Sequence, residues 1–169
     1  MYHQAVRQFV KTLENLDRIL DKTVRHANAR NFDVNNIFGA RLFPDMLPFA
    51  SQVRIACDTA KNAAASLAGK QPPRHEDDEK SFEQLRARVA KCLAYLETFT
   101  AADFEKTTAK NIIPVPNPKG KALYAEDYVM SRALPNFHFH VTTAYAILRH
   151  GGVELGKSDY LGTLDFVDT

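Results

Sequence analysis

Residues 133–148 read ALPNFHFHVTTAYAIL and contain no Asp, Glu, Lys or Arg. In and just before this stretch, apolar positions recur at alternating spacings of three and four, the pattern of a helix that buries one face. The members of this stripe are Val129, Ala133, Phe137, His140, Ala144 and Ile147. The stretch is too short and too polar for a membrane span, which requires ~20 apolar residues. We therefore predict a buried helix over residues 126–149.

Three further segments carry the same pattern and predict helices over residues 3–29, 46–68 and 78–99. Their stripes are Phe9, Leu13, Leu16, Leu20 and Val24; Met46, Ala50, Val53, Cys57, Ala60, Ala64 and Leu67; and Phe82, Leu85, Val89, Cys92, Leu96 and Phe99. Strands that alternate with helices, as a parallel sheet requires, are missing from the pattern. The sequence therefore predicts an all-α four-helix bundle. A looser helical array is the alternative.

The expected helix boundaries come from capping residues and breakers. Asp45 is predicted to cap the second helix. Residues 70–75, which contain two prolines, are predicted to form the turn that follows it. The acidic run at residues 76–79 suits the positive end of the third helix.

Between the third and fourth helices, apolar residues flank the turn sequence Asn117-Pro118-Lys119-Gly120. This arrangement predicts a small β-hairpin before the last helix. Residues 30–43 are expected to be an irregular connection with one short helical turn around residues 34–38.

Length and composition suit one domain of an ordinary globular protein. We expect residues 1–169 to form this domain, with residues 152–169 as a C-terminal tail that packs on the bundle. Lys and Arg number 22 against 20 Asp and Glu, a balance that argues against a dedicated nucleic-acid binder. The N-terminus meets charge too early for a signal peptide. Cys57 and Cys92 are expected to be buried and reduced, as in a cytoplasmic protein that does not engage a membrane.

Residues 151–158, GGVELGKS, match the phosphate-loop pattern of nucleotide-binding proteins. That motif requires a strand before the loop and a helix after it, so that backbone N–H groups face the phosphates. Here a predicted helix precedes the loop and only a short tail follows it. We therefore interpret the match as a helix end and not as a nucleotide site.

One polar residue, His140, lies in the apolar stripe of the fourth helix. A buried imidazole needs a hydrogen-bond partner or a metal ion. Asn136 and Thr143 lie about one turn away on the same face, and Gln52 lies near the inward stripe of the second helix. These side chains predict a polar pocket in an apolar bundle. The alternative is a core histidine that is satisfied by one neighbour.

Two strings of this chain resemble those of a known family. The first is PDMLPF at residues 44–49, followed by Gln52-Val53 and Ala56-Cys57-Asp58. The second is PNFHFHVTTAYAILR at residues 135–149, followed by LGK and DYLG. On these strings the chain resembles an uncharacterised, domain-of-unknown-function branch of the DinB/YfiT-like superfamily. The resemblance implies a four-helix bundle with a long connection before the last helix.

Members of that superfamily often hold a divalent metal with three histidines, one on the second helix and two on the fourth. The resemblance places Gln52 at the first position, His140 at the second and Ala144 at the third. Only one of the three ligands is therefore present, and the resemblance implies that the usual metal centre is missing. A weaker site would join His140 to Asp45 or Asp58.

We predict a cytoplasmic DinB-like protein that needs no cofactor and binds a small molecule near His140, with Gln52, Asn136, Thr143 and Asp45 as candidate contacts. Pairing of two copies through a bundle face is also expected. The alternative is a metal-dependent hydrolase or thiol-dependent transferase of the DinB/YfiT type, with zinc or nickel on His140. A third possibility is a structural or interaction protein with a dry core. The sequence identifies no catalytic residue, because no nucleophile has a recognisable base beside it.

Overall fold

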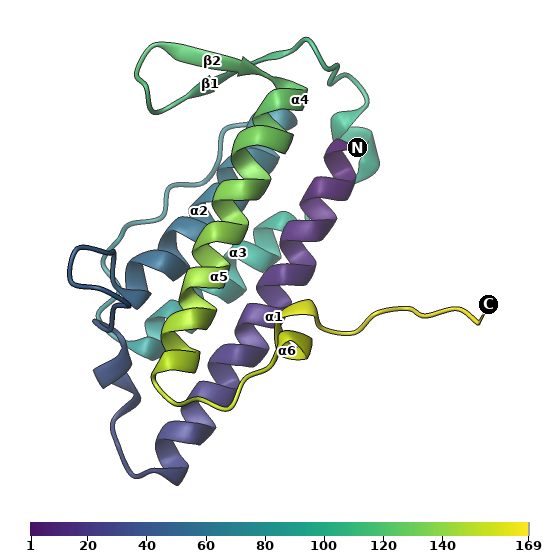
Figure 1. The fold of residues 1–169 in the computed structure, drawn as a ribbon. Coiled ribbons are helices and arrows are strands. Elements are labelled where there is room, and N and C mark those ends of the chain that lie inside the picture. Colours follow the sequence, from purple (N-terminus) through teal and green to yellow (C-terminus); the bar gives the residue numbers. More distant parts are fainter. Residues whose placement is uncertain (169) are drawn as a thin grey trace.

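Four long helices dominate the computed structural model, which describes residues 1–168 (Figure 1). They are α1 (Tyr2–Ala29), α2 (Phe49–Leu67), α3 (Phe82–Leu96) and α5 (Leu134–His150). The shorter elements are the 3-10 turns η1 (Val34–Ile37) and η2 (Ala101–Phe104), strands β1 (Ile112–Val115) and β2 (Lys121–Tyr124), α4 (Ala125–Asp127), the π-helical segment η3 (Tyr128–Ala133) and α6 (Lys157–Leu161). The predicted helical fold with an antiparallel hairpin before the last long helix is confirmed. No helix in residues 1–168 is long and apolar enough to cross a membrane.

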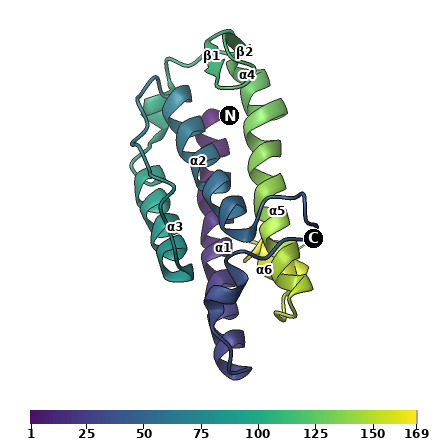
Figure 2. The same ribbon diagram turned by 90° about the vertical axis from the view of Figure 1, so that its left-hand side faces the viewer.

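Helices α2 and α3 run in the same direction. Phe49 and Phe82, which begin the two helices, stack with ring centroids 5.7 Å apart. Further along, the Cys92 thiol donates to the Cys57 carbonyl at 3.3 Å. Parallel neighbours need a connection that returns along their length, and residues 68–81, called here the strap, provide it (Figure 2). The predicted turn at residues 70–75 is therefore wrong, because these residues belong to an extended crossing.

The core lies between the inner faces of α1, α2, α3 and α5. Its largest fully buried side chains come from all four helices and include Phe9, Leu13, Leu16, Ile19, Leu20, Phe49, Phe82, Leu85, Leu96, Phe137 and Leu148. Most of the stripe residues predicted from the sequence are among the buried set. Helical periodicity therefore placed the correct faces inward.

Helix α2 starts three residues later than predicted. Pro48 precedes it in an extended conformation, and Phe49 N–H donates to the Ala40 carbonyl at 2.8 Å. Asp45 lies in an exposed loop and does not cap the helix, so that prediction is wrong. The physical reason is Pro48, because a proline disfavours helical geometry at the residue before it.

Helix α3 also begins later than predicted, at Phe82 and not at residue 78. Ser81 is its N-cap, and the Ser81 hydroxyl accepts from Gln84 N–H at 3.2 Å. The acidic run at residues 76–79 therefore lies in the strap and does not decorate the helix start. Two of its carboxylates, those of Asp77 and Glu79, instead pair with the buried Arg88, as described below.

The last long helix is interrupted before Pro135. The prediction of one helix over residues 126–149 is replaced by α4, the π-helical segment η3 and then α5, with Pro135 in the first turn of α5. Proline has no N–H for the carbonyl four residues earlier. The wider turn of η3 falls directly before this missing donor.

The segment after α5 returns to α1. Val153 and Leu155 are buried, Asn15 Nδ2 donates to the Tyr160 carbonyl at 2.9 Å, and Lys22 pairs with Asp159 at 2.6 Å. Residues 163–168 are exposed, and Thr169, the end of the predicted tail, lies outside the described residues. The phosphate-loop match follows a helix and leads into the five-residue α6, so it lacks the context that the motif requires.

Gly162→Ala should loosen α6 from α1. Gly162 adopts φ 67° and ψ −159°, a conformation essentially restricted to glycine, and an added Cβ would overlap the Asn15 carboxamide, with Cγ 2.8 Å away. We expect a loss of about 1–3 kcal/mol, measured by urea unfolding, and faster hydrogen exchange at residues 157–161. Gly39→Ala is the control, because nothing lies within 4 Å of the added Cβ there. Equal behaviour of the two variants would contradict this expectation.

Candidate functional site

Gln52 and His140 join α2 to α5 by a hydrogen bond. His140 Nδ1 lies 2.7 Å from Gln52 Oε1, and Gln52 Nε2 donates to the Leu47 carbonyl at 3.0 Å. The side chains are buried, with 8% of His140 and 2% of Gln52 exposed. Because the amide nitrogen of Gln52 is committed to Leu47, its oxygen accepts, and His140 Nδ1 is assigned as the donor. Burial lowers the pKa of His140 and favours the neutral ring.

The other predicted site residues lie apart from this pair. The Thr143 hydroxyl donates to the Phe139 carbonyl of its own helix at 2.7 Å. Asn136 is exposed and donates to the Thr59 hydroxyl at 2.8 Å. Asp45 is in the exposed loop before α2. Of the five candidates, the structure joins only Gln52 and His140 directly.

Asn136 lines a hollow of about 260 Å³ between α2 and the η3–α5 junction. The lining residues are Ile55, Asp58, Thr59, Asn62, Pro116, Tyr128, Arg132, Ala133 and Asn136. Sequence reasoning missed Thr59, Tyr128 and Arg132 as members of a site. A signal was present, because residues 128, 132 and 136 are spaced by four and therefore lie close together along one side of a helix that contains Pro135.

Of the two charged side chains that line this hollow, Asp58 has ion-pair partners and Arg132 has none among the described residues. Asp58 pairs with Arg88 at 2.7 Å and with Lys61 at 3.0 Å. Arg132 makes no ion pair with any residue of the described chain. Burial raises the pKa of Tyr128, which keeps its phenol neutral. The hollow therefore offers one uncompensated cation together with hydroxyl and amide groups.

The free energy of unfolding should fall as the pH drops from about 7 to about 5. Burial lowers the pKa of His138 and His140 below the ordinary 6.5 in the folded protein. The unfolded chain then binds more protons than the folded chain, so stability rises with pH across this window and is lost on acidification. Urea midpoints from pH 5 to pH 8 measure the effect, and His140→Gln should flatten the curve. A midpoint that does not change with pH would contradict the expected titration.

The residues that the resemblance assigns to a metal position do not form a three-histidine set. The α2 position is an amide, Gln52, whose two polar atoms are occupied by His140 and Leu47. The position one turn after His140 is the methyl group of Ala144. Residues 1–168 bring together no three His, Cys, Asp or Glu side chains that could hold a metal ion.

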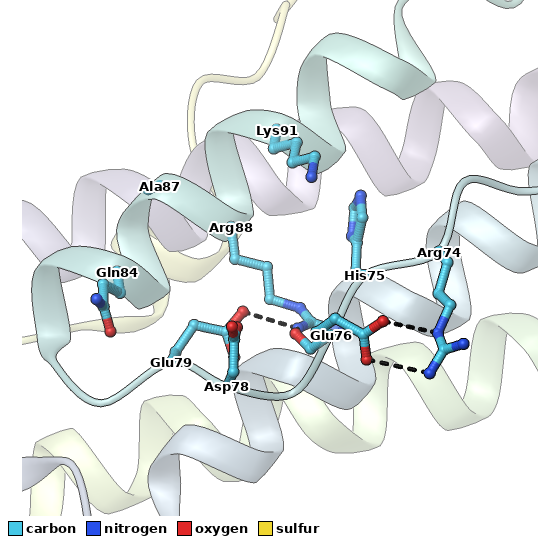
Figure 3. Close-up of a pocket in the computed structure, with 9 residues that line it drawn as sticks. All are labelled: Arg74, His75, Glu76, Asp78, Glu79, Gln84, Ala87, Arg88 and Lys91. Carbon is cyan, nitrogen blue, oxygen red and sulfur yellow. Dashed lines mark hydrogen bonds and ion pairs between the residues drawn. The ribbon is translucent and has the colours of Figure 1, made fainter.

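A second polar hollow, of about 320 Å³, lies between the strap and α3 (Figure 3). The strap contributes Arg74, His75 and Glu76 to it, and α3 contributes Arg88 and Lys91. In Figure 3, the Lys91 side chain reaches down from α3 towards the His75 ring.

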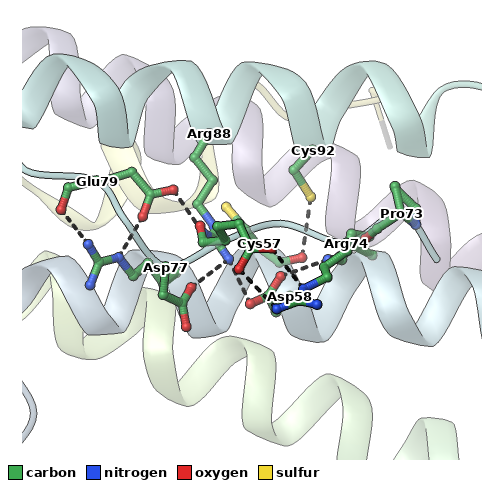
Figure 4. Close-up of polar contacts among 11 residues, drawn as sticks. Cys57, Asp58, Pro73, Arg74, Asp77, Glu79, Arg88 and Cys92 are labelled. Carbon is green, nitrogen blue, oxygen red and sulfur yellow. Dashed lines mark hydrogen bonds and ion pairs between the residues drawn. The ribbon is translucent and has the colours of Figure 1, made fainter.

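Arg88 is the centre of an ion-pair network beneath the strap (Figure 4). Its side chain is only 2% exposed and pairs with Asp58 at 2.7 Å, Glu79 at 2.8 Å and Asp77 at 3.1 Å. Burial alone would raise the pKa of Glu79, but hydrogen bonds from Arg88 and Arg54 outweigh it and lower the pKa. The network therefore gives Asp77 and Glu79 of the acidic run a role in holding the strap.

Buried cations also hold the backbone of the strap. Lys61 donates to the Pro73 carbonyl at 2.8 Å, and Arg88 donates to the Glu76 carbonyl at 2.9 Å. Arg54 donates to the Glu79 carbonyl. Side chains from α2 and α3 therefore satisfy strap carbonyls that have no helical partner.

The fold defines a mostly helical protein with a small antiparallel hairpin before its last long helix. The chain is similar to a crystal structure of a DinB family member protein from Shewanella denitrificans, with 42% identity and a TM-score of 0.92 over 99% of this chain and 95% of that chain. The family described as Domain of unknown function (DUF1993) matches residues 1–161, and the chain belongs to this family. The comparison with curated proteins finds no match. The resemblance drawn from the two sequence strings is confirmed.

Proposed function

We propose that this DinB-like protein binds a small carboxylate in the hollow beside η3 and works without a three-histidine metal centre. The observation that carries the proposal is Arg132, which lines the hollow with no carboxylate of the described chain paired to it. A guanidinium recognises a carboxylate through two parallel hydrogen bonds. Asp58 does not cancel this cation, because it is already paired with Arg88 and Lys61.

The rest of the lining suits a small polar ligand. Thr59, Asn62 and Asn136 offer hydroxyl and amide groups, and Ile55 and Ala133 offer an apolar wall. Binding sites commonly combine an apolar lining with a few polar groups in a volume of about 300–1,000 Å³, so a hollow of about 260 Å³ favours a small molecule. A π-helical segment such as η3 is also frequent at functional sites.

The proposed site keeps Asn136 from the sequence-based set and replaces His140 with Arg132 as its principal contact. Gln52 and His140 then serve as a hydrogen-bonded pair that holds α2 against α5 further along.

We also infer a cytoplasmic location, where free thiols such as Cys57 and Cys92 persist.

Thermal unfolding with small carboxylates tests the proposal. Acetate, lactate and benzoate are compared with the corresponding amides at constant ionic strength. A ligand at 100 times its Kd stabilises the folded state by ~2.7 kcal/mol, which raises Tm by roughly 5–11 °C. We expect this rise in the wild type and in Arg149→Gln, an exposed control at the far end of α5, but not in Arg132→Gln.

Two outcomes would overturn the proposal. One is an equal rise in Arg132→Gln, and the other is an equal effect of amides and carboxylates. Native mass spectrometry with added zinc distinguishes the proposed carboxylate-binding protein from the alternative, a metal-dependent hydrolase or transferase. Such an enzyme would hold close to one zinc ion per chain. The same spectra report whether two copies pair.

A further inference from the structure

The buried polar side-chain atoms that have no hydrogen-bond partner gather at one place in residues 1–168. They are Asp58 Oδ1, both ring nitrogens of His75 and Arg88 Nε. Asp58 Oδ1 still has an ion pair with Lys61 at 3.0 Å. His75 is half-buried, but both of its ring nitrogens are covered and neither has a hydrogen-bond partner in the described residues, so its ring is the least compensated of these groups. An unpaired buried polar group costs about 1–3 kcal/mol.

Cations from the two helices beneath the strap surround His75. The protonated form of His75 is disfavoured by Lys61 of α2 and by Arg88 and Lys91 of α3. The Asp58 carboxylate has the opposite effect and favours the protonated form. Lys61 and Arg88 are tied to Asp58. Lys91 has no ion pair within the described residues, and its side chain reaches towards the His75 ring (Figure 3).

The charged groups of the strap itself do not supply an acid to His75. Glu76 pairs with Arg74 at 2.8 Å, and Asp77 and Glu79 pair with Arg88. Asp78 is exposed to solvent. A proton on His75 would therefore add a cation to a region whose neighbouring carboxylates are already engaged.

We propose that the strap is an acid-sensitive latch, in which protonation of His75 releases the strap from α2 and α3. Release lets the imidazolium reach water, and it breaks the contacts of Lys61 with Pro73 and of Arg88 with Glu76. The strap is suited to open locally because it has no helix or strand of its own and is held by these side chains.

The direction of the pH effect follows from linkage. Burial first, and then Lys61, Lys91 and Arg88, lower the pKa of His75 while the strap is closed. In the open strap the ring is hydrated, and its pKa returns to about 6.5. Acid therefore favours the open strap, and at pH 5.5 the opening equilibrium rises by at most about tenfold relative to pH 7.5.

The two thiols beneath the strap provide the readout. Cys57 and Cys92 are the cysteines of the chain, both are fully buried, and Cys57 lies near Arg88 and Asp58. Modification by 4,4′-dithiodipyridine is followed by absorbance, and each rate is divided by the rate of the urea-unfolded chain at the same pH. The quotient removes the intrinsic pH dependence of the reagent and the thiols.

We expect the corrected rate in the wild type to rise several-fold, and by up to about tenfold, between pH 7.5 and pH 5.5. His75→Gln should remove the rise, and Lys91→Gln should reduce it, since loss of that cation brings the closed-state pKa nearer to 6.5. His138→Gln is the control that keeps the rise, because His138 contacts Tyr160 and not the strap. After division by the intrinsic exchange rate at each pH, the protection factors of residues 70–80 should fall on acidification and those of α1 should not.

An equal rise in the wild type and His75→Gln would overturn the latch, because it would show that global unfolding exposes the thiols. A rate that does not change with pH in the wild type would also overturn it. If His75→Gln does not fold, Lys91→Gln and the exchange of residues 70–80 still decide the question.

Discussion

Arg88→Met should lower the free energy of unfolding by about 3–5 kcal/mol. The substitution removes the cation from a network in which Glu79 and Asp58 are directly paired with the buried guanidinium. It also leaves the Glu76 carbonyl without its donor. Removing one partner of a buried ion pair is costly because the remaining charge keeps its desolvation penalty without the compensating attraction. Urea unfolding at about pH 7 measures the loss.

Arg86→Met is the matched control for this effect. Arg86 lies on the same helix, but its side chain is 34% exposed and its partners Asp17 and Asp21 are half exposed. Exposed pairs of this kind contribute about 0–1 kcal/mol, because water screens them. Equal losses in the two variants would show that the strap network contributes no more than a surface pair.

Phe137→Ala should lower the free energy of unfolding by about 3–5 kcal/mol. Phe137 has no exposed surface and packs edge-on against Phe9, with ring centroids 4.8 Å apart, so it joins α5 to α1. Truncation removes the buried ring and leaves a cavity that a core built from four helices can only partly fill.

Phe139→Ala tests whether this cost depends on position and not on residue type. Phe139 is two residues away on the same helix and 58% exposed. Its truncation should change the free energy of unfolding by no more than about 0.5 kcal/mol. Similar losses for both phenylalanines would contradict the assigned faces of α5.

Periodicity in the sequence was sufficient to predict the inward faces of the long helices. Phe9, Val53, Phe82 and Phe137 were correctly expected to be buried in one core, because a helix repeats every 3.6 residues and a buried face must repeat with it. The hairpin was also predictable, since a local turn signal between two short apolar runs specifies it.

The helix starts were less predictable because they depend on contacts made across the fold. Phe49 N–H donates to Ala40, and Asn35 accepts from Phe82 N–H at 2.9 Å. The carbonyl and carboxamide that receive these first N–H groups come from the connection between α1 and α2. Capping residues near each start therefore gave boundaries that were displaced by a few positions.

In the candidate site, too, one part was predictable from the local sequence and another part depended on contacts across the fold. That His140 would be buried beside a polar partner followed from its place in the stripe, and Gln52 was the correct partner. That Arg132 and Asn136 would line a separate hollow depended on how the η3–α5 junction packs against α2, which the spacing of these residues alone does not specify.

The sequence by itself determined where the long helices lie, apart from their exact ends, and which face of each helix is buried, because helical geometry and apolar burial act over a few neighbouring residues. Only the tertiary structure decided that α2 and α3 run in parallel, that the strap must cross them, and that Arg88 and Lys61 hold it there. These features depend on the packing order of whole helices. Partners thirty residues apart, such as Asp58 and Arg88, meet only after that order is set.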